Sequence, residues 1–433
     1  MLASVSGIRG IFNQDLSLSD IVRLSSNFAS SERSMTFLMG RDTRRTGDII
    51  AKSVAGVLLA RGAHVVDFGT ISTPALFRES LKQEAAAIMI TASHNEPEWN
   101  GLKFITGGKG IGPDQLPQIL SASKTTGQGT SNGTLTRNRR QSYDEDIIGR
   151  FGEGSFDGVK VAADFGGGAA LFHAPRILRM LGCDVTTIND TPGVFNRIID
   201  PVADDLSLLR KVVKRKGCDI GLAFDCDGDR LVIIDDDGKK RGGDFMLTLA
   251  LNEMLPSSSA NTVVVSVDTT QAVDELVKSV RGNVYRSRVG EVNVVQTMVE
   301  KDARLGGEGS SGGLIDGSFN YCRDSMVAAL TIIRGIKTNG SKIFRDTKEY
   351  NQTRLALPIS RAKAARAIKE MEKDYRNAET VDGVKIRLSP KSWVLIRPSG
   401  TEDVVRVSAE APTAKESQRI AKTFLKKLKE LSR

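Results

Sequence analysis

The chain has 433 residues, of which 40% are hydrophobic and 26% are charged, and its formal net charge is +9. This length exceeds a single core and predicts two to four domains of an ordinary globular protein. No apolar run reaches about 18 residues, which excludes a membrane-spanning helix, and the first residues lack the pattern of a signal peptide. We therefore expect a cytoplasmic protein with no membrane partner.

The basic charge has two interpretations. Nucleic-acid binding would favour a basic stripe interleaved with aromatic residues, yet only 5% of the residues are aromatic. Much of the basic excess lies in two predicted helices, 361–376 and 415–433, so solvated helix faces and a phosphate-binding cleft explain it better. We expect no nucleic-acid partner.

The four cysteines are scattered and form no CxxC pair, which predicts free thiols without structural zinc. They are Cys183, Cys218, Cys226 and Cys322.

The first third of the chain predicts a mostly parallel sheet covered by helices. A Gly-flanked loop, Ser6-Gly-Ile-Arg-Gly10, presents Arg9. Ser93 and His94 follow an apolar run, 85–90, and so lie at the carboxyl end of a strand, where open sheets bind ligands. On spacing alone, a serine here is more often a turn residue. Alternating elements precede it: strands at 35–39 and 64–68, and helices at 47–60 and 74–81.

A second alternating unit ends in an acidic loop. Strand 159–164 and a helix at 170–181 lead to a final apolar strand, 219–224, which runs directly into Asp225-Cys-Asp-Gly-Asp-Arg230. Carboxylates at 225, 227 and 229 repel one another unless a cation joins them, and hard oxygen ligands suit Mg²⁺. An EF-hand is excluded because Arg230 takes the place of the required glycine. A solvated turn is disfavoured because apolar strands lie on both sides.

A third unit ends in a glycine-rich loop. Helices at 245–255, 271–280 and 292–300 alternate with strands at 262–267 and 283–285, and a short strand then leads to Gly306-Gly-Glu-Gly-Ser-Ser-Gly-Gly313. Glycine-rich sequences are often flexible linkers. This one follows the last strand of its unit, as Ser93 and Asp225 do, which favours a functional loop.

The last part of the chain groups its strands between two helices and predicts a smaller α+β domain. Between two strands lies Arg397-Pro-Ser-Gly-Thr401, either a phosphate-binding loop or an ordinary hairpin turn. We expect four domains, at 1–140, 141–243, 244–350 and 351–433. The predicted elements of the last domain are helices at 361–375 and 414–431 and strands at 384–388, 393–397 and 404–409.

Four motifs, in this order, resemble those of the α-D-phosphohexomutases, which include phosphoglucomutase, phosphomannomutase and phosphoglucosamine mutase. They are the serine loop Thr91-Ala-Ser-His-Asn with Asn100-Gly-Leu-Lys103, the aspartate loop, the glycine-rich loop and Arg397-Pro-Ser-Gly-Thr401. The likeness covers nearly the whole chain. Four positions depart from the pattern: Glu96 and Asp403 each replace a proline, Ser311 replaces a glycine, and the histidine common after it in bacterial members is absent.

The resemblance implies a fold and a set of roles. The fold is three similar mixed-sheet α/β domains followed by a smaller C-terminal α+β domain around a central cleft, with a last domain that swings. Ser93 would carry a phosphoryl group, and Mg²⁺ would be held by phosphorylated Ser93 with Asp225, Asp227 and Asp229. Lys103 is the candidate general base, provided that its pKa is lowered, or else an electrostatic partner, and His94 shapes the site. The implied substrate-binding residues are Arg9, Arg230, Arg286, Arg288, Glu308, Ser310, Arg397, Ser399, Gly400 and Thr401.

The implied reaction interconverts hexose 1-phosphate and hexose 6-phosphate through phosphoserine and a hexose 1,6-bisphosphate intermediate. The recognition loop matches no substrate group cleanly, and we expect glucose and mannose phosphates ahead of glucosamine phosphate. A serine hydrolase is remote because no GxSxG motif is present and the other histidines, His64 and His173, are distant. A non-catalytic sugar-phosphate-binding protein would need neither Ser93 nor the aspartates. The expected partner is a phosphosugar, with a homodimer left open.

Overall fold

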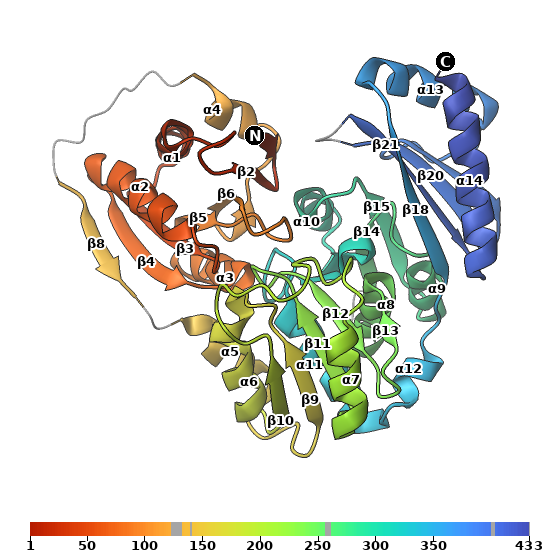
Figure 1. Ribbon diagram of the computed structural model, residues 1–433, viewed down its shortest axis with the longest axis horizontal. Helices are drawn as coiled ribbons and strands as arrows, with labels where there is room; N and C mark the ends of the chain where they lie inside the picture. Colours follow the sequence, from red (N-terminus) through yellow and green to blue (C-terminus); the bar gives the residue numbers. More distant parts are fainter. Residues whose placement is uncertain (123–131, 139–140, 256–260, 400–402, 433) are drawn as a thin grey trace.

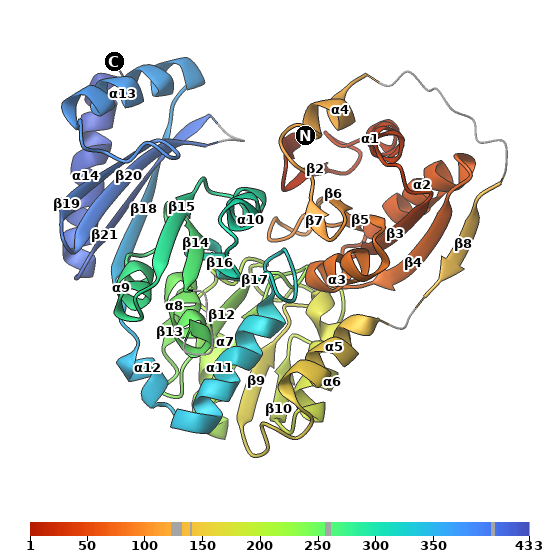
Figure 2. The same ribbon diagram turned by 180° about the vertical axis from the view of Figure 1, so that it is seen from behind.

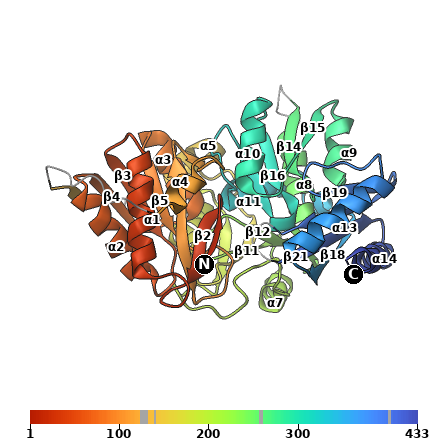
Figure 3. The same ribbon diagram turned by 90° about the horizontal axis from the view of Figure 1, so that it is seen from above.

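The computed structural model describes residues 1–122, 132–138, 141–255, 261–399 and 403–432. Four sheet-containing units follow one another along an arc, with the N-terminal unit at one end and the C-terminal unit at the other (Figure 1). Seen from above, the second and third units lie between these two ends (Figure 3). Three mixed α/β sheets and a last antiparallel sheet confirm the predicted fold.

The first sheet has the strand order β1-β2-β6-β5-β3-β4-β8, with β7 paired to β6. The prediction of a loop around Arg9 is wrong, because this segment forms strand β2. Arg9 pairs there with Gly101 of β6, and the buried side chain of Ile8 adds the segment to the sheet. The strands are β1 (Leu2–Ser4), β2 (Gly7–Ile11), β3 (Thr36–Arg41), β4 (His64–Thr70), β5 (Ala86–Ile90), β6 (Trp99–Thr106), β7 (Lys109–Gly110) and β8 (Thr134–Arg137). The helices are α1 (Leu18–Ser31), α2 (Gly47–Ala60), α3 (Thr73–Gln83) and α4 (Leu116–Leu120).

The second sheet has the order β10-β9-β11-β12-β13. The predicted helix at 170–181 is divided into a 3₁₀ turn, Ala169–Phe172, and the helix α6. Pro175 explains the break, because proline lacks an N–H group and is tolerated only in the first turn of a helix. The strands are β9 (Lys160–Asp164), β10 (Asp184–Ile188), β11 (Ile220–Phe224), β12 (Leu231–Ile234) and β13 (Lys240–Arg241), with helices α5 (Ser142–Phe151), α6 (Ala174–Met180) and α7 (Ser207–Lys216).

The third sheet has the order β15-β14-β16-β17. Its helix α11 was not predicted, because it is buried on nearly every side and shows no polar face from which helical periodicity could be read. Figure 2 shows α11 in the lower part of the molecule, where it contacts α8 of its own unit and β11 and β12 of the second unit. The strands are β14 (Thr262–Ser266), β15 (Asn283–Ser287), β16 (Leu305–Glu308) and β17 (Gly313–Asp316), with helices α8 (Gly243–Met254), α9 (Ala272–Ser279), α10 (Glu291–Glu300), α11 (Ser325–Asn339) and α12 (Lys342–Asp346).

The fourth sheet is antiparallel, in the order β18-β21-β20-β19, and two helices cover it. Strand β18 was not predicted, whereas the two helices and the other three strands lie where the sequence placed them, within a few residues. The elements are β18 (Asn351–Pro358), α13 (Arg361–Asp374), β19 (Val384–Ser389), β20 (Ser392–Pro398), β21 (Val404–Ala411) and α14 (Ala414–Leu431).

The first three sheets share one device. In each, a strand that is parallel to one neighbour turns back into an antiparallel partner: β5 into β6, β11 into β12, and β16 into β17. The turns are the serine loop, the aspartate loop and the glycine-rich loop. One hydrophobic cluster also runs through all three units, from Leu38 to Phe344, while the fourth unit has a core of its own. The first three units therefore form a continuous base.

Two simpler predictions are also settled. All four cysteines are buried and unpaired, as expected. Within the described part of the chain, no helix combines the length and the apolar character that crossing a membrane requires. The boundaries proposed for the four domains remain predictions.

Candidate active site

The three hairpin turns meet at a cavity of about 780 Å³, and the fourth unit supplies its remaining wall. Among the described residues, this cavity is lined by polar and charged side chains from all four units. It thus lies where four distant stretches of sequence come together. The lining residues include five that were predicted to bind substrate, and His94 lies beside them: Arg9, Arg230, Glu308, Ser310 and Arg397.

Ser93 adopts a backbone conformation that serine rarely takes. Its φ is +51°, in the left-handed region, and such conformations cost about 1–3 kcal/mol and gather at functional sites. The backbone N–H of Ser93 donates to Thr91 Oγ1 at 2.8 Å, and Ser93 Oγ donates to Asp225 Oδ2 at 3.1 Å. The turn therefore directs the serine hydroxyl to the aspartate loop.

Arg44 holds this turn in place through hydrogen bonds to its backbone carbonyls. Its guanidinium is buried and donates to the carbonyls of Ser93 at 2.7 Å, Asn95 at 2.6 Å and Trp99 at 2.9 Å, and also to that of Glu96. Asp42 pairs with it at 3.1 Å. The sequence interpretation missed this residue, although an arginine just after β3, in the same unit as the serine, was a usable signal.

The aspartate loop forms a compact carboxylate cluster. The candidate ligand atoms of Asp225, Asp227 and Asp229 lie within 4.8 Å of one another, and all three residues are buried. Burial and the charges of Asp227 and Asp229 raise the pKa of Asp225 well above its ordinary value. Asp227 Oδ1 and Asp229 Oδ1 have no hydrogen-bond partner among the described residues. Buried oxygens left without donors fit a hard divalent cation such as Mg²⁺.

Neighbouring units hold the aspartate loop on both sides. At the start of α3, Thr73 Oγ1 donates to Asp227 Oδ2 at 2.5 Å, and its backbone N–H donates to the carbonyl of the same residue at 2.8 Å. At the start of α11, Ser325 Oγ donates to the Gly228 carbonyl at 2.6 Å. The first and third units therefore position the carboxylates of the second.

Lys103 lies over the carboxylate cluster. Its Nζ is 3.4 Å from Asp229 Oδ2 and 3.8 Å from Asp227 Oδ2. Burial opposes the charged form, but Asp229, Glu291 and Asp227 outweigh it and raise the lysine pKa. The expectation that cationic surroundings lower this pKa is therefore wrong, because the nearest groups are anionic.

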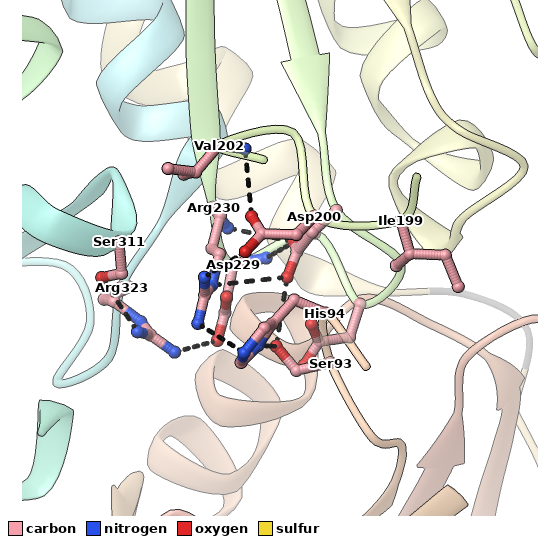
Figure 4. A network of polar contacts seen from close by, with 12 residues as sticks. Ser93, His94, Ile199, Asp200, Val202, Asp229, Arg230, Ser311 and Arg323 are labelled. Carbon is pink, nitrogen blue, oxygen red and sulfur yellow. Dashed lines mark hydrogen bonds and ion pairs between the residues drawn. The ribbon is translucent and has the colours of Figure 1, made fainter. Parts of the chain in front are cut away.

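His94 and Arg230 lie beside Ser93 (Figure 4), and Arg9 also lines the cavity near them. The imidazole Nδ1 lies 3.4 Å from Ser93 Oγ, and Nε2 lies 3.4 Å from Arg230 Nη2. Burial, then the charges of Arg230 and Arg9, hold the pKa of His94 well below its ordinary value. Arg9 Nη1 donates to Asn95 Oδ1 at 3.1 Å. The histidine is thus a neutral ring among fixed positive charges.

The glycine-rich loop is ordered by a residue that the sequence interpretation missed. Glu308 accepts hydrogen bonds from the Gly290 backbone at 2.6 Å and from Arg323 Nη1 at 3.1 Å, and burial raises its pKa. Ser311 Oγ donates to the Glu308 carbonyl at 3.2 Å. Ser310 hydrogen-bonds Asp268. The loop is therefore a built site and no flexible linker.

The phosphate-binding motif faces the same cavity from the fourth unit. Arg397 lines the cavity, with Nη1 3.5 Å from Asp382, and the backbone N–H of Ser399 donates to Val404 at 2.9 Å. Gly400 and Thr401 lie outside the described residues. Two further arginines of this unit, which the motif did not indicate, also line the cavity: Arg354 and Arg406.

Two predicted arginines are not among the described residues that line the cavity. Arg286 donates to the carbonyls of Ser266 at 3.1 Å and Thr269 at 2.7 Å and pairs with Asp274, so its guanidinium braces the β14–α9 connection. Arg288 is exposed, and its Nε lies 3.4 Å from the Val381 carbonyl of the fourth unit. Among the described residues, the positive charges that line the cavity are therefore those of other arginines.

Comparison with known proteins matches the chain from end to end. Models of phosphoglucomutase/phosphomannomutase match alpha/beta/alpha domain I at residues 1–129, domain II at 149–238, domain III at 242–351 and the C-terminal domain at 355–427. The chain is 32% identical over 450 residues to a probable phosphoglucosamine mutase of Methanobrevibacter smithii, covering 99% of this chain and 98% of that one.

Two solved structures share the fold. A phosphoglucomutase/phosphomannomutase family protein of Burkholderia thailandensis has a TM-score of 0.87 at 24% identity, covering 100% of this chain and 98% of that one. An Aspergillus fumigatus N-acetylphosphoglucosamine mutase in complex with glucose 1,6-bisphosphate has a TM-score of 0.58 at 15% identity, covering 92% of this chain and 78% of that one. With its four matched domains, the chain belongs to the phosphoglucomutase/phosphomannomutase family and is a phosphohexomutase.

Proposed function

We propose that the protein is a phosphoglucosamine mutase, which interconverts glucosamine 6-phosphate and glucosamine 1-phosphate. The observation that carries this choice is the 32% identity over nearly the full length to a probable phosphoglucosamine mutase, a name shared by other relatives. The expectation of glucose and mannose phosphates ahead of glucosamine phosphate is therefore revised, because it rested on an imperfect loop motif alone.

The charge of the cavity supports an amino sugar. In the described part of the chain, its wall on the third unit carries the carboxylates of Asp268, Glu291 and Glu308 beside a single arginine, Arg323, whereas most of its other cations are arginines of the remaining units. A hexosamine phosphate has one cationic amine and one dianionic phosphate, so both signs find a complement. Glucose and mannose phosphates lack the amine, so they would add no cationic partner to these carboxylates beyond Arg323, which already pairs with Glu291 and Glu308.

The proposed reaction starts from Ser93 in its phosphorylated form. A sugar hydroxyl attacks the phosphorus, the P–Oγ bond breaks, and the hydroxyl proton passes to the leaving Ser93 oxygen, which gives a hexose 1,6-bisphosphate and free Ser93. After the sugar turns over, Ser93 Oγ attacks the other phosphoryl group, the bond from phosphorus to the sugar oxygen breaks, and that oxygen takes the serine proton. Positioning and charge neutralisation dominate such transfers, and the 3.1 Å contact between Ser93 Oγ and Asp225 supports this location for them.

The residues around Ser93 divide the remaining work. Asp225, Asp227 and Asp229 would hold Mg²⁺ together with the phosphoserine, and the bound cation would neutralise phosphoryl charge. We propose Lys103 as an electrostatic partner rather than a base, since its Nζ lies 3.4 Å from Asp229 and 3.8 Å from Asp227. His94 shapes the site. Phosphate oxygens would be bound by arginines, of which the cavity offers Arg9, Arg230, Arg354, Arg397 and Arg406.

The fourth unit is proposed to close over the substrate. Its hydrophobic core is separate from the core that the first three units share, so rotation would leave both cores intact and, of the hydrophobic clusters of described residues, would disturb only the small one of Val267 with Trp393 and Leu395. Its motif residues Arg397, Ser399, Gly400 and Thr401 would hold the phosphate that does not react. The cavity volume of about 780 Å³ leaves room for a bisphosphate to turn over. A homodimer remains a prediction that light scattering would test.

A coupled mutase assay tests the function. The purified protein is supplied with Mg²⁺, a trace of hexose 1,6-bisphosphate, and glucosamine, glucose or mannose 1-phosphate in parallel. We expect the highest kcat/KM with glucosamine 1-phosphate and none for Ser93→Ala, and intact-mass spectrometry should detect one added phosphate on Ser93. A higher kcat/KM with glucose or mannose phosphate would overturn the substrate assignment. Activity that survives in Ser93→Ala would overturn the phosphoserine reaction.

A further inference from the structure

Arg323 connects the aspartate loop, which is the proposed metal loop, to the glycine-rich loop, which is the proposed sugar-recognition loop. A single guanidinium makes this connection. Nη2 donates to Asp229 Oδ2 at 2.6 Å, while Nη1 donates to Glu308 Oε2 at 3.1 Å and to Ser311 Oγ at 3.2 Å. Nε lies 3.3 Å from Glu291 Oε2. One buried positive charge thus faces three carboxylates from two units. The side chain also lines the cavity, where Figure 4 shows it directed at Asp229 and Ser311.

The backbone around Arg323 fixes where this guanidinium can lie. Its backbone N–H donates to Glu291 Oε2 at 2.9 Å, the next residue, Asp324, caps α11, and Ser325 donates to the Gly228 carbonyl of the metal loop. The side chain then passes over Gly313, where a Cβ atom would overlap its Cγ and Cδ. Gly313 pairs with Glu308 in the β16–β17 hairpin. The position is therefore built by packing as well as by charge.

Charge on Asp229 is shared between competing cations. Asp229 is buried, so its carboxylate depends on the cations that contact it. Its Oδ2 is taken by Arg323 and Lys103, while its Oδ1 has no partner among the described residues. When Asp229 binds a divalent cation, its attraction for Arg323 weakens, and the guanidinium then pairs more fully with Glu308. Cation binding at the aspartate loop is thereby coupled to the glycine-rich loop.

We propose that Arg323 is a positioning residue that couples the cation site to sugar recognition. It acts through Glu308, whose orientation it sets, and it competes with the divalent cation for Asp229. This proposal deepens the proposed function and rests on the phosphohexomutase reaction at this site, but it does not depend on which hexose is the substrate. Coupling between two sites is reciprocal, so sugar phosphate should also alter cation affinity through Arg323.

The consequence is a pair of opposite effects that a purely structural role would not produce. Loss of the charge in Arg323→Gln removes a competitor for Asp229, so Mn²⁺, used as a spectroscopic probe, should bind about tenfold more tightly. The same change leaves Glu308 Oε2 without its donor, while Oε1 keeps the Gly290 N–H, so the KM for sugar phosphate should rise about tenfold. Arg323→Lys keeps the charge but loses the fork geometry, so it should raise KM with little change in Mn²⁺ affinity.

The test measures Mn²⁺ binding by electron paramagnetic resonance on unphosphorylated protein, with and without glucose 1,6-bisphosphate, beside KM and melting temperature. Arg304→Gln is the matched control, because Arg304 pairs with Asp316 in the same unit and does not line the described cavity. The bisphosphate should change Mn²⁺ affinity in the native protein and in the control but not in Arg323→Gln. Gly313→Ala, which displaces the side chain while keeping its charge, should raise KM and weaken this linkage.

Two results would overturn the proposal. One is Mn²⁺ affinity that falls together with the melting temperature in Arg323→Gln, which indicates structural support alone. The other is unchanged KM and unchanged linkage in both Arg323→Lys and Gly313→Ala. If Arg323→Gln does not fold, those two variants still decide the question. Failure of the proposed function appears separately, as native protein that binds Mn²⁺ and bisphosphate but turns over glucosamine 1-phosphate poorly.

Discussion

Arg44 offers a direct test of how the serine turn is held. Replacing it with methionine keeps most of the side-chain volume but removes the guanidinium donors that bind the carbonyls of the Ser93 turn and leaves Asp42 without its ion pair. A buried acceptor left unsatisfied costs about 1–3 kcal/mol, and removing one partner of a buried ion pair costs about 3–5 kcal/mol. These terms overlap at one site, so we expect Arg44→Met to lower the free energy of unfolding by about 4 kcal/mol.

Activity should fall as well, for a separate reason. The left-handed conformation of Ser93 persists only while its surroundings impose it. A displacement of about 1 Å in a reacting group costs about 100-fold in rate, so kcat should fall by about that factor in the variant that remains folded. Urea titration measures the first effect, and kcat with phosphoserine occupancy by mass spectrometry measures the second.

The matched control is Arg45→Ala, because Arg45 is the exposed neighbour of Arg44. Surface substitutions of this kind usually change stability by less than about 0.5 kcal/mol. Arg44→Lys should be intermediate, since one ammonium can keep the ion pair with Asp42 but cannot reach all the carbonyls. If Arg44→Met keeps both stability and kcat within the range of Arg45→Ala, the idea that Arg44 imposes the serine turn is refuted.

Three further predictions concern the divalent cation, a buried histidine of the second unit and a buried lysine of the fourth unit. Chelation of Mg²⁺ by EDTA should abolish turnover and lower the melting temperature, with both restored by Mg²⁺, because the buried aspartates then repel one another. Burial lowers the pKa of His173 to about 4, so the unfolded chain binds its proton first and stability should fall by about 3 kcal/mol as pH drops from 7 to 4; His173→Gln should lack this component in urea titrations at each pH. Burial lowers the pKa of Lys385 to about 7, and stability should therefore rise as pH increases from 7 towards 10; an unchanged pH dependence in Lys385→Met would contradict this assignment.

The sequence by itself indicated the chemistry, because each reacting group lies in a contiguous motif after a strand. Ser93, the three aspartates, Glu308 and Arg397 could be chosen without coordinates, because their motifs resemble those of the α-D-phosphohexomutases; on spacing alone Ser93 would more often be a turn residue. Their neighbours in space belong to other units: Ser93 Oγ and Asp225 Oδ2 are 132 residues apart in the chain. The alternation of strands and helices also predicted three similar α/β units, which the sheet topology confirms.

Only the tertiary structure decided which other side chains serve the site. Arg44, Thr73 and Arg323 act on partners that are 49, 154 and 94 residues away, and no spacing in the sequence encodes such contacts. The raised pKa of Lys103 and the internal bonding of Arg286 likewise depend on which charges and carbonyls the fold brings beside them. Motifs record the groups that react, whereas burial and distance, which determine electrostatic strength, arise only when the units pack together.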